Sequence, residues 1–376
     1  MLEKLVIICG GTGGHFYPGL STAEELRRRG GEPLLFITGR NAEQQCGTAS
    51  AKGIKSIILS SSTPPTGLPG KISFALHSLK GIIEARRKLR EFKPSAVLAM
   101  GSFHSAAPAI AAWTLRIPVF VHDGNARVGK ANLFLSNFAR HMALSFPPVN
   151  SNNIKCKWTV TGMPVRSQIA ECNLSKKEAI GLINSRHSVD LTEDAPLLLV
   201  FGGSQGAEAI NQCVPEALKL QGRDNFQVVH LSGAKNRDSL EKHYAGCHFK
   251  HLVIETSGEM EIFYSAADLV ICRSGGSTVA ELSVFAKFAI LIPYPFATDS
   301  HQDDNARYYC SGGAGIAIAE KELTVTKLAS TIAGWLEQTD CYSQKGRLSK
   351  ELAKPDASLS ILQLIEGNLG SLTISE

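Results

Sequence analysis

The sequence lacks the features that mark several specialised classes of protein. Its nine cysteines include no C-x-x-C pair, which argues against a disulfide framework or a structural zinc site and favours a reducing compartment. No apolar run approaches the roughly 20 residues that a helix needs to cross a bilayer. The first apolar run, residues 5–9, is too short for the core of a signal peptide. We therefore expect a protein of the cytoplasm.

Excess charge and metal-ligand spacings are also scarce. The chain has 39 Lys and Arg against 34 Asp and Glu, and the net charge of +5 is too mild to imply nucleic-acid binding. No Asp-x-Asp or His-x-x-x-His spacing occurs, so that no metal site is expected. At 376 residues and 44% hydrophobic content, the chain suits two globular domains with cores of their own.

Two glycine-rich turns stand at matching places in the two halves of the chain. Gly10-Gly11-Thr12-Gly13-Gly14-His15 follows the apolar run 5–9, and Gly202-Gly203-Ser204-Gln205-Gly206 follows the apolar run 197–201. Each turn precedes a helix-like stretch, an order with which parallel sheets present N–H groups to a phosphate. The second turn lacks the Lys-Ser/Thr of a P-loop and the full G-x-G-x-x-G spacing, which disfavours NTP hydrolysis and NAD. The pair predicts two similar domains that face one cleft around a phosphorylated ligand.

Apolar runs alternate with helix-like stretches along both halves. The expected strands are 5–9, 33–38, 56–59, 96–100, 119–122, 142–145, 158–161, 197–201, 226–231, 252–254, 269–272, 289–293 and 315–318. The expected helices are 18–29, 74–92, 105–115, 130–138, 207–220, 259–266, 277–286, 301–311 and 324–338. This alternation predicts an α/β fold with two Rossmann-like domains, each built on a parallel sheet.

The domain boundary is expected where proline interrupts the pattern. Gly162-Met163-Pro164 ends the last strand of the first half and suits a hinge. The domains are therefore expected at residues 1–165 and 166–351. The tail, about 352–376, reads as part of a helix broken near Pro355 and is expected to pack back on the first domain.

His15 is the best candidate for a general base. It stands at the mouth of the first turn, and imidazole accepts a proton near neutral pH. Pro18 suits the first turn of the following helix, where a missing N–H costs nothing. The alternative interpretation is a tight turn with a capping histidine. The strand ends at 101–105 and 122–125 belong beside His15, because loops beyond the carboxyl ends of strands line the crevice of an open α/β sheet.

Polar residues in the second half suit a sugar nucleotide. Glu281 lies inside the helix that follows the small residues 274–278, where a carboxylate can accept hydrogen bonds from a ribose diol. Gln302 and Asn305 are three residues apart on one helical face, and neutral amides suit sugar hydroxyls. The alternatives are a surface glutamate and a solvated helix start.

A basic amphipathic stretch covers residues 68–94. Its apolar positions at helical spacing include Ile72, Leu76, Leu79 and Ile83, and its basic positions include Lys80, Arg86 and Arg87. Such a helix can lie on an anionic membrane surface. The alternative is a crossover helix packed on its sheet with a solvated basic face.

With these segments in order, the chain resembles the MurG family of bacterial peptidoglycan N-acetylglucosaminyltransferases over nearly its whole length. The resemblance rests on Gly10–Leu20, Gly162–Arg166, Gly202–Gly206 with Asn211-Gln212, Cys272–Glu281 and Gln302–Ala306. It implies a GT-B fold with an interdomain cleft. It also implies transfer of GlcNAc from UDP-GlcNAc to the muramyl 4-hydroxyl of lipid I, with inversion and without a metal or other cofactor. The implied location is the cytoplasmic face of the bacterial inner membrane, with the basic amphipathic stretch docked on the anionic surface.

The resemblance further implies roles for matching residues. His15 is implied as the catalytic base. The residues implied to bind the donor are Arg166, Gly203, Ser204, Gln205, Gly206, Ser257, Met260, Gly276, Ser277, Thr278, Glu281, Gln302 and Asn305. The residues implied to face the acceptor are Thr12, Gly13, Gly14, His15, Phe103, His122 and Asn125.

The chain departs from the family's pattern mainly on the acceptor side. The family usually has Glu-Gln at Asp123-Gly124, Asn at Met163 and Gly at Ser102. Two other functions therefore stay open at this point, a diacylglycerol glycosyltransferase of the same architecture and a non-catalytic UDP-sugar-binding protein. A sugar-nucleotide epimerase would need acid and base carboxylates around the sugar, and the sequence offers no convincing pair.

Overall fold

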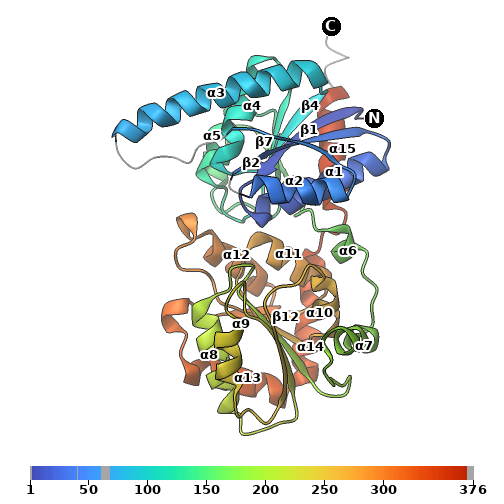
Figure 1. Cartoon of the computed structure of the whole chain (residues 1–376), viewed down its shortest axis with the longest axis vertical. Helices are drawn as coiled ribbons and strands as arrows, with labels where there is room; N and C mark the ends of the chain where they lie inside the picture. Colours follow the sequence, from blue (N-terminus) through green and yellow to red (C-terminus); the bar gives the residue numbers. More distant parts are fainter. Residues whose placement is uncertain (1, 40, 61–67, 371–376) are drawn as a thin grey trace. The chain divides into compact units, whose positions relative to one another are not determined.

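The computed structural model of the chain describes the backbone of residues 2–39, 41–60 and 68–370, with side chains for all of these except 68–78. It consists of two compact units (Figure 1). Unit 1 comprises residues 1–166 and 354–376, and unit 2 comprises residues 167–353. The C-terminal segment therefore belongs to the same unit as the N-terminus.

Unit 1 is built on a seven-stranded parallel sheet in the order β3-β2-β1-β4-β5-β6-β7. The strands are β1 (Lys4–Gly10), β2 (Glu32–Thr38), β3 (Lys55–Ile58), β4 (Ala96–Ala99), β5 (Val119–Asp123), β6 (His141–Leu144) and β7 (Lys157–Val160). Leu5 and Ile7 pack into one hydrophobic cluster, whereas Val6 and Ile8 pack into another. A continuous apolar run forms β1 because both faces of the sheet are covered.

Helices cover both faces of this sheet. They are α1 (Gly13–Arg28), α2 (Ala42–Ala51), α3 (Leu68–Phe92), α4 (Ala106–Thr114), α5 (Lys130–Leu135) and α15 (Ala357–Gly370). On one face, Ile361 of α15 packs in the same cluster as Phe16 of α1. The carboxylate of Glu366 on α15 accepts hydrogen bonds from the Leu2 N–H at 2.7 Å and from Arg29 at 3.2 Å. These contacts fasten the C-terminal helix to unit 1, beside its first strand.

Unit 2 is built on a six-stranded parallel sheet in the order β10-β9-β8-β11-β12-β13. The strands are β8 (Leu197–Phe201), β9 (Gln227–Leu231), β10 (Lys250–Ile254), β11 (Leu269–Cys272), β12 (Phe288–Leu291) and β13 (Gly315–Ala317). The helices are α6 (Ser167–Ala170), α7 (Lys176–His187), α8 (Glu208–Lys219), α9 (Arg237–Tyr244), α10 (Met260–Ala266), α11 (Gly276–Val284), α12 (His301–Ser311), α13 (Val325–Glu337) and α14 (Thr339–Leu348).

The expected alternation of strands and helices is confirmed, with some corrections. The helices α2, α7 and α9 form where the sequence pattern predicts none. For α7 a local signal existed, because Ser175 and Glu178 form a reciprocal capping box.

The placement of Pro18 in the first helical turn was wrong. The helix α1 begins at Gly13, so that Pro18 lies inside it and is buried. Among the described residues, no helix is long and apolar enough to cross a membrane.

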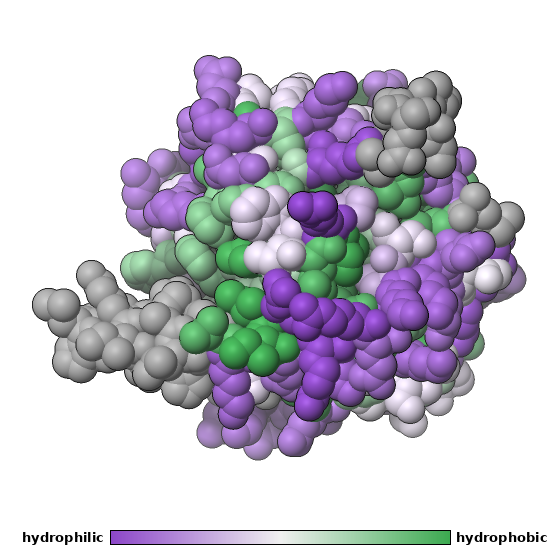
Figure 2. All heavy atoms as spheres, turned by 90° about the horizontal axis from the view of Figure 1, so that it is seen from above, coloured by the Kyte–Doolittle hydropathy of each residue, from purple (hydrophilic) through white to green (hydrophobic). Residues whose placement is uncertain are grey.

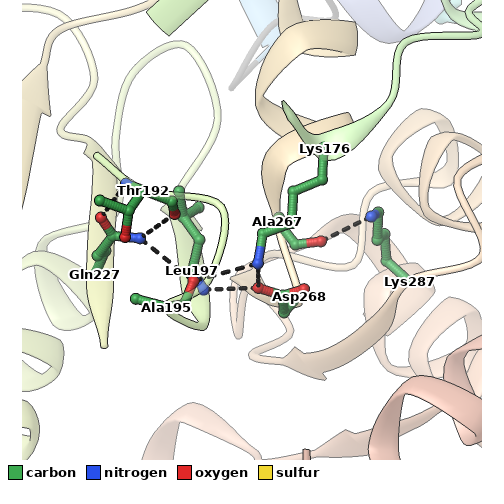
Figure 3. A network of polar contacts seen from close by, with 8 residues as sticks. All are labelled: Lys176, Thr192, Ala195, Leu197, Gln227, Ala267, Asp268 and Lys287. Carbon is green, nitrogen blue, oxygen red and sulfur yellow. Dashed lines mark hydrogen bonds and ion pairs between the residues drawn. The ribbon is translucent and has the colours of Figure 1, made fainter. Parts of the chain in front are cut away.

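A polar network holds the segment before β8 to the amino-terminal edge of the unit 2 sheet (Figure 3). The Asp268 carboxylate accepts hydrogen bonds from Lys176 Nζ and from the Leu197 N–H, both at 2.8 Å. The Gln227 side chain bonds both backbone groups of Thr192, at 2.7 and 2.8 Å. Structural contacts therefore occupy the amino-terminal edge of this sheet. The opposite, carboxyl-terminal edge is the one at which we expect ligand-binding loops.

Lys287 adds a half-buried cation to the same edge. Its Nζ donates to the Ala267 carbonyl at 2.7 Å (Figure 3). Burial lowers the pKa of Lys287 to about 8, from an ordinary value of 10.5. Between these two values the unfolded chain binds more protons than the folded chain. The free energy of unfolding therefore gains a contribution that increases as the pH rises through this window.

We expect Lys287→Met to remove that pH dependence. As the pH is raised from 7.5 to 10.5, the free energy of unfolding of the wild type should increase by about 1 to 3 kcal/mol relative to that of the variant. Urea unfolding across this range measures it, and subtracting the variant cancels other titrating groups. Lys321→Met, at an exposed position, is the matched control and should track the wild type. A constant difference for Lys287→Met would contradict the assignment.

Candidate functional site

In unit 1 the first glycine turn meets the loop after β4. The sheet order reverses direction between β1 and β4, and loops at such a switch point form the ligand crevice of open α/β sheets. A Cβ built on Gly101 would lie 3.1 Å from Cδ2 of His15 and 3.2 Å from Nδ2 of Asn132. His15 and the strand ends that sequence reasoning placed beside it are therefore neighbours.

The His15 ring is oriented by the residue that begins its helix. Thr12 is the N-cap of α1, and its Oγ1 lies 3.0 Å from Nδ1 of His15. Gly10 and Gly11 have φ angles of +127° and +80°. A Cβ on Gly10 would lie 2.3 Å from the Thr38 carbonyl oxygen, so the turn needs glycine for both conformation and space. Gly13 and Gly14 form the exposed first residues of the helix.

Asp123 organises the loop after β5. Its Oδ1 accepts from the Asn125 N–H at 3.0 Å, and its Oδ2 accepts from the Gly129 N–H at 2.9 Å and from Asn132 Nδ2 at 2.8 Å. Asn132 is itself buried. The carboxylate thus fixes the path of the loop that presents Asn125, which is half-buried.

His122 is an internal residue of this region. It is 1% exposed, and its Nε2 lies 3.1 Å from Ser145 Oγ and 3.4 Å from the Gly162 carbonyl oxygen. Burial lowers the pKa of His122 to about 4, the Gly162 hydrogen bond opposes the shift, and nearby His15 adds to it. His122 is therefore neutral at pH 7, and it supports the loop after β5 from inside unit 1.

Phe103 and Arg166 lie at the edges of the same region. Phe103 is half exposed in a short 3-10 turn after β4. The Arg166 guanidinium sits 5.4 Å from the centre of the Tyr17 ring on α1, a cation–π arrangement. Arg166 belongs to unit 1 by its contacts, and Tyr17 lies one helical turn beyond Gly13 on α1.

In unit 2 the second glycine turn rests on the loop after β9. The turn leaves β8 at Gly202, and Gly203, Ser204 and Gln205 are exposed. The Gly206 N–H donates to the Gly203 carbonyl at 2.9 Å. A Cβ on Gly206 would lie 2.2 Å from the Ser232 carbonyl oxygen. The two loops thus touch through main-chain atoms.

A buried polar relay supports this contact. Asn211 Nδ2 donates to the Ser232 carbonyl at 2.9 Å, so that its Oδ1 accepts from His230 Nε2 at 3.2 Å. The other ring nitrogen of His230 then accepts from the Tyr244 hydroxyl at 2.9 Å. Burial lowers the pKa of His230 to about 3, which matches a neutral ring with one donor and one acceptor.

The loops after β10 and β11 carry the predicted nucleoside-binding residues. Ser257 Oγ accepts from the Glu259 N–H at 3.0 Å, just before α10 begins at Met260. Gly276 is the first residue of α11, and Ser277 and Thr278 follow, both half-buried. One turn later, Glu281 is half-buried and its Oε2 accepts from the Tyr264 hydroxyl at 3.0 Å.

The loop after β11 is braced by α12. Ser274 Oγ donates to the Gln302 carbonyl at 2.8 Å, and Asn305 Nδ2 donates to the Ser274 carbonyl at 3.0 Å. Asn305 is fully buried, whereas Gln302 is half-buried and its Oε1 accepts from the Tyr294 N–H at 3.0 Å. Asn305 therefore shapes the turn from inside unit 2.

Several supporting residues were not singled out from the sequence. These are Asn132, His230, Tyr264 and Arg273. Arg273 donates to the Ile292 and Pro293 carbonyls at 3.1 Å and pairs with Glu320 at 2.5 Å, which fixes the loop after β12. All four act through contacts with residues distant in sequence.

Within the described part of the chain, no three His, Cys, Asp or Glu side chains are grouped as a metal site requires.

An apolar surface with basic neighbours lies on unit 1. Leu79 and Ile83 of α3 are 55% and 61% exposed, and Lys80 and Arg87 flank them as exposed residues. The Arg86 guanidinium donates to Thr114 Oγ1, which joins α3 to the end of α4. Figure 2 shows apolar side chains among hydrophilic ones on the face that carries α3. The side chains of Ile72 and Leu76, predicted on the same face, lie outside the described residues.

Unit 1 also carries exposed aromatic residues. Trp113, beside Thr114, and Phe134 of α5 are each about half exposed. Both contact the Phe138 ring, with ring centres 4.9 and 5.4 Å away.

Comparisons with known proteins place both units in one family. The Glycosyltransferase family 28 N-terminal domain matches residues 5–144, and the Glycosyltransferase family 28 C-terminal domain matches residues 197–360. A protein of Anaeromyxobacter dehalogenans, named UDP-N-acetylglucosamine--N-acetylmuramyl-(pentapeptide) pyrophosphoryl-undecaprenol N-acetylglucosamine transferase, is 33% identical over 98% of this chain and 94% of its own length. The protein of that name from Psychromonas ingrahamii is 34% identical over 96% of this chain and 98% of its own.

Solved structures agree on the architecture. The crystal structure of Acinetobacter baumannii MurG matches with a TM-score of 0.76 at 24% identity, over 97% of this chain and 99% of that one. The chain belongs to the MurG family of glycosyltransferases. A UDP-GlcNAc 2-epimerase from Neisseria meningitidis has a TM-score of 0.70 at 15% identity, over 97% of this chain and 100% of its own, which shows a shared fold alone. The GT-B fold expected from the sequence is thus confirmed, with one Rossmann-like parallel sheet in each unit.

Two departures from the MurG pattern form a matched pair. A Cβ on Gly124 would lie 2.8 Å from Cε of Met163, so that the missing side chain at 124 makes room for methionine at 163. Met163 Sδ accepts from Ser145 Oγ at 3.4 Å, and that hydroxyl also contacts His122. A third departure, Ser102, has a φ of +72°, a conformation in which the family's usual glycine would be unstrained.

We expect Gly124→Gln and Met163→Asn to rescue each other. Gly124→Gln alone overpacks the site and should lower the free energy of unfolding by about 1 to 3 kcal/mol. Met163→Asn alone leaves a gap and should also be destabilising. The double variant should recover at least half of the summed loss, as measured by urea unfolding in a double-mutant cycle. Additive losses would mean that the two positions are independent.

Proposed function

We propose that this protein transfers GlcNAc from UDP-GlcNAc to the muramyl 4-hydroxyl of lipid I, with inversion at the anomeric carbon, to form lipid II. The observation that carries the proposal is the match to the named transferases over 98% of the chain at 33% identity. The site geometry supports it, because His15 lies at the switch point of one sheet, and a glycine turn and Glu281 lie at the carboxyl edge of the other.

His15 serves as the general base. When Nδ1–H is donated to Thr12 Oγ1, at 3.0 Å, Nε2 holds the lone pair that accepts a proton. The acceptor oxygen attacks the anomeric carbon, its proton passes to Nε2, and the bond from that carbon to the β-phosphate oxygen breaks. Thr12, Gly13, Gly14, Phe103, His122 and Asn125 form or support the acceptor-binding part of unit 1.

Unit 2 binds the donor. Gly203, Ser204 and Gln205 offer main-chain N–H groups to the diphosphate, and Arg166 assists with charge. Gly206 closes the turn, because its own N–H donates to the Gly203 carbonyl. Because negative charge grows on the leaving diphosphate, such fixed donors stabilise the transition state. Ser257 and Met260 flank the uracil, Glu281 accepts from the ribose hydroxyls, and Gly276, Ser277, Thr278 and Gln302 face the GlcNAc. Asn305 holds their turn in place.

One turnover assay separates this function from its rivals. Radiolabelled UDP-GlcNAc is incubated with a lipid I analogue, with and without EDTA, and the glycolipid product is counted. We expect transfer at the same rate in both conditions. Parallel reactions with diacylglycerol and UDP-glucose or UDP-galactose test the glycolipid alternative. Donor binding without transfer to either acceptor would indicate a non-catalytic UDP-sugar-binding protein.

In the same assay, His15→Ala should lower kcat at least ~100-fold, the low end for loss of a general base. Calorimetric titration should show unchanged affinity for UDP-GlcNAc, because the imidazole acts on the acceptor. His248→Ala, at an exposed position of unit 2, is the control and should retain wild-type turnover. Near-normal kcat in His15→Ala would exclude this residue as the base.

We also propose that unit 1 docks peripherally on the anionic cytoplasmic face of the bacterial inner membrane. The support is the exposed apolar side chains of Leu79 and Ile83 on α3, whose basic residues include Lys80, Arg86 and Arg87, together with exposed Trp113 and Phe134 on the same unit. Apolar side chains flanked by cations suit a surface of acyl chains and anionic headgroups.

Ile83→Glu should weaken this docking. A sedimentation assay with phosphatidylglycerol vesicles measures the partition coefficient of the protein. We expect this coefficient to fall at least roughly tenfold, because a charge replaces buried apolar area. Leu220→Glu, on unit 2 with 61% exposure, matches the change in chemistry and should bind like the wild type. Equal binding of the three proteins would refute the docking surface.

A further inference from the structure

A fully buried tyrosine holds the carboxylate that we assign to the ribose. Tyr264 of α10 has 0% exposure, and its hydroxyl donates to Glu281 Oε2 at 3.0 Å. Glu281 lies 17 residues further along the chain, on α11. The bond therefore joins the helix that follows the uracil loop to the helix that follows the loop after β11.

The tyrosine ring cannot turn away from this position. Phe201 meets it edge-on, with ring centres 5.9 Å apart and an interplanar angle of 83°. Phe285 stacks on it at 5.2 Å and 21°. Such pairs fix a ring in place and orientation. Phe201 is the last residue of β8, directly before the glycine turn, so that the direction of the hydroxyl is set by the same strand that presents the turn.

The surroundings of the Glu281 carboxylate strengthen its hydrogen bond with Tyr264. Cys272 is fully buried, and burial together with the nearby Glu281 charge raises the pKa of its thiol far above the ordinary value. The carboxylate thus borders a dry interior on one side. In low dielectric, an oriented donor to a carboxylate is worth more than in water. An ionised carboxylate also has acceptor sites beyond the one that Tyr264 occupies.

We propose that Tyr264 positions Glu281 for the ribose of the donor, and that it thereby sets the selectivity for ribose over 2′-deoxyribose. The inference rests on the proposed function. The hydroxyl holds Oε2 and fixes the carboxylate plane, and the remaining acceptor sites of Glu281 receive the ribose hydroxyls. Tyr264 is a positioning residue, because it acts through Glu281.

Packing alone explains the ring of Tyr264 and leaves its hydroxyl unexplained. Tyr264→Phe keeps the ring between Phe201 and Phe285 and removes the hydroxyl that donates to Glu281. A matched control exists in Tyr309→Phe. Tyr309 is also fully buried in unit 2, and its hydroxyl donates to the Lys287 carbonyl, at the opposite end of the sheet from the ligand loops.

The experiment compares the Kd of UDP with that of 2′-deoxy-UDP by calorimetric titration. The ratio of the two constants does not depend on how much of a preparation is folded. We expect wild type and Tyr309→Phe to prefer UDP about tenfold, the size of a hydrogen bond to a charged group. In Tyr264→Phe the ratio should fall to about threefold or less, and the loss in turnover should appear in the KM of UDP-GlcNAc more than in kcat.

Glu281→Ala separates failure of this inference from failure of the site. The inference predicts that Glu281→Ala abolishes the preference for UDP and that adding Tyr264→Phe to it changes nothing further. If Glu281→Ala lacks the preference while Tyr264→Phe keeps it, the positioning role is wrong and the ribose site stands. If Glu281→Ala keeps both the preference and the UDP affinity, the ribose assignment in the proposed function is wrong as well.

Discussion

Main-chain contact between the loops after β8 and β9 is the constraint on which the proposed donor site depends. A Cβ on Gly233 would lie 2.1 Å from the Gly206 nitrogen, and one on Gly206 would lie 2.2 Å from the Ser232 carbonyl oxygen. No side chain fits between these loops. The contact leaves Gly203, Ser204 and Gln205 exposed at the carboxyl edge of the sheet. The buried relay through Asn211 and His230 then holds Ser232 in register.

In unit 1, different contacts hold the glycine turn in place. There the turn after β1 is pinned to β2, because the Gly11 N–H donates to the Thr38 carbonyl at 2.8 Å, and Gly101 leaves room for the His15 ring. One unit therefore exposes uncharged main-chain donors, whereas the other places an imidazole at its switch point. This division suits a reaction in which a diphosphate leaves and a hydroxyl loses its proton.

Local patterns predicted the parts of the fold that depend on short-range physics. The strands 197–201 and 269–272 match the structure at both ends, because strands buried on both faces are continuous apolar runs. The helix α9 was missed, since its buried face rests on Leu240 and Tyr244 alone in a polar segment. Tyr264, His230 and the fit of Met163 to Gly124 depend on residues 14 to 39 positions away. Pairings of that kind are set by the topology of the sheet, which a single sequence does not specify.

The central claim is that close main-chain packing at Gly206 builds the proposed diphosphate site. Titration of UDP-GlcNAc into Gly206→Ala tests it most directly, with Gly222→Ala as the control. Gly222 also has a positive φ, +58°, but no atom lies within 4 Å of its Cβ position. We predict a Kd raised at least ~10-fold for Gly206→Ala, because the loops must separate, and wild-type affinity for Gly222→Ala. A folded Gly206→Ala protein that binds UDP-GlcNAc like the wild type would contradict the account.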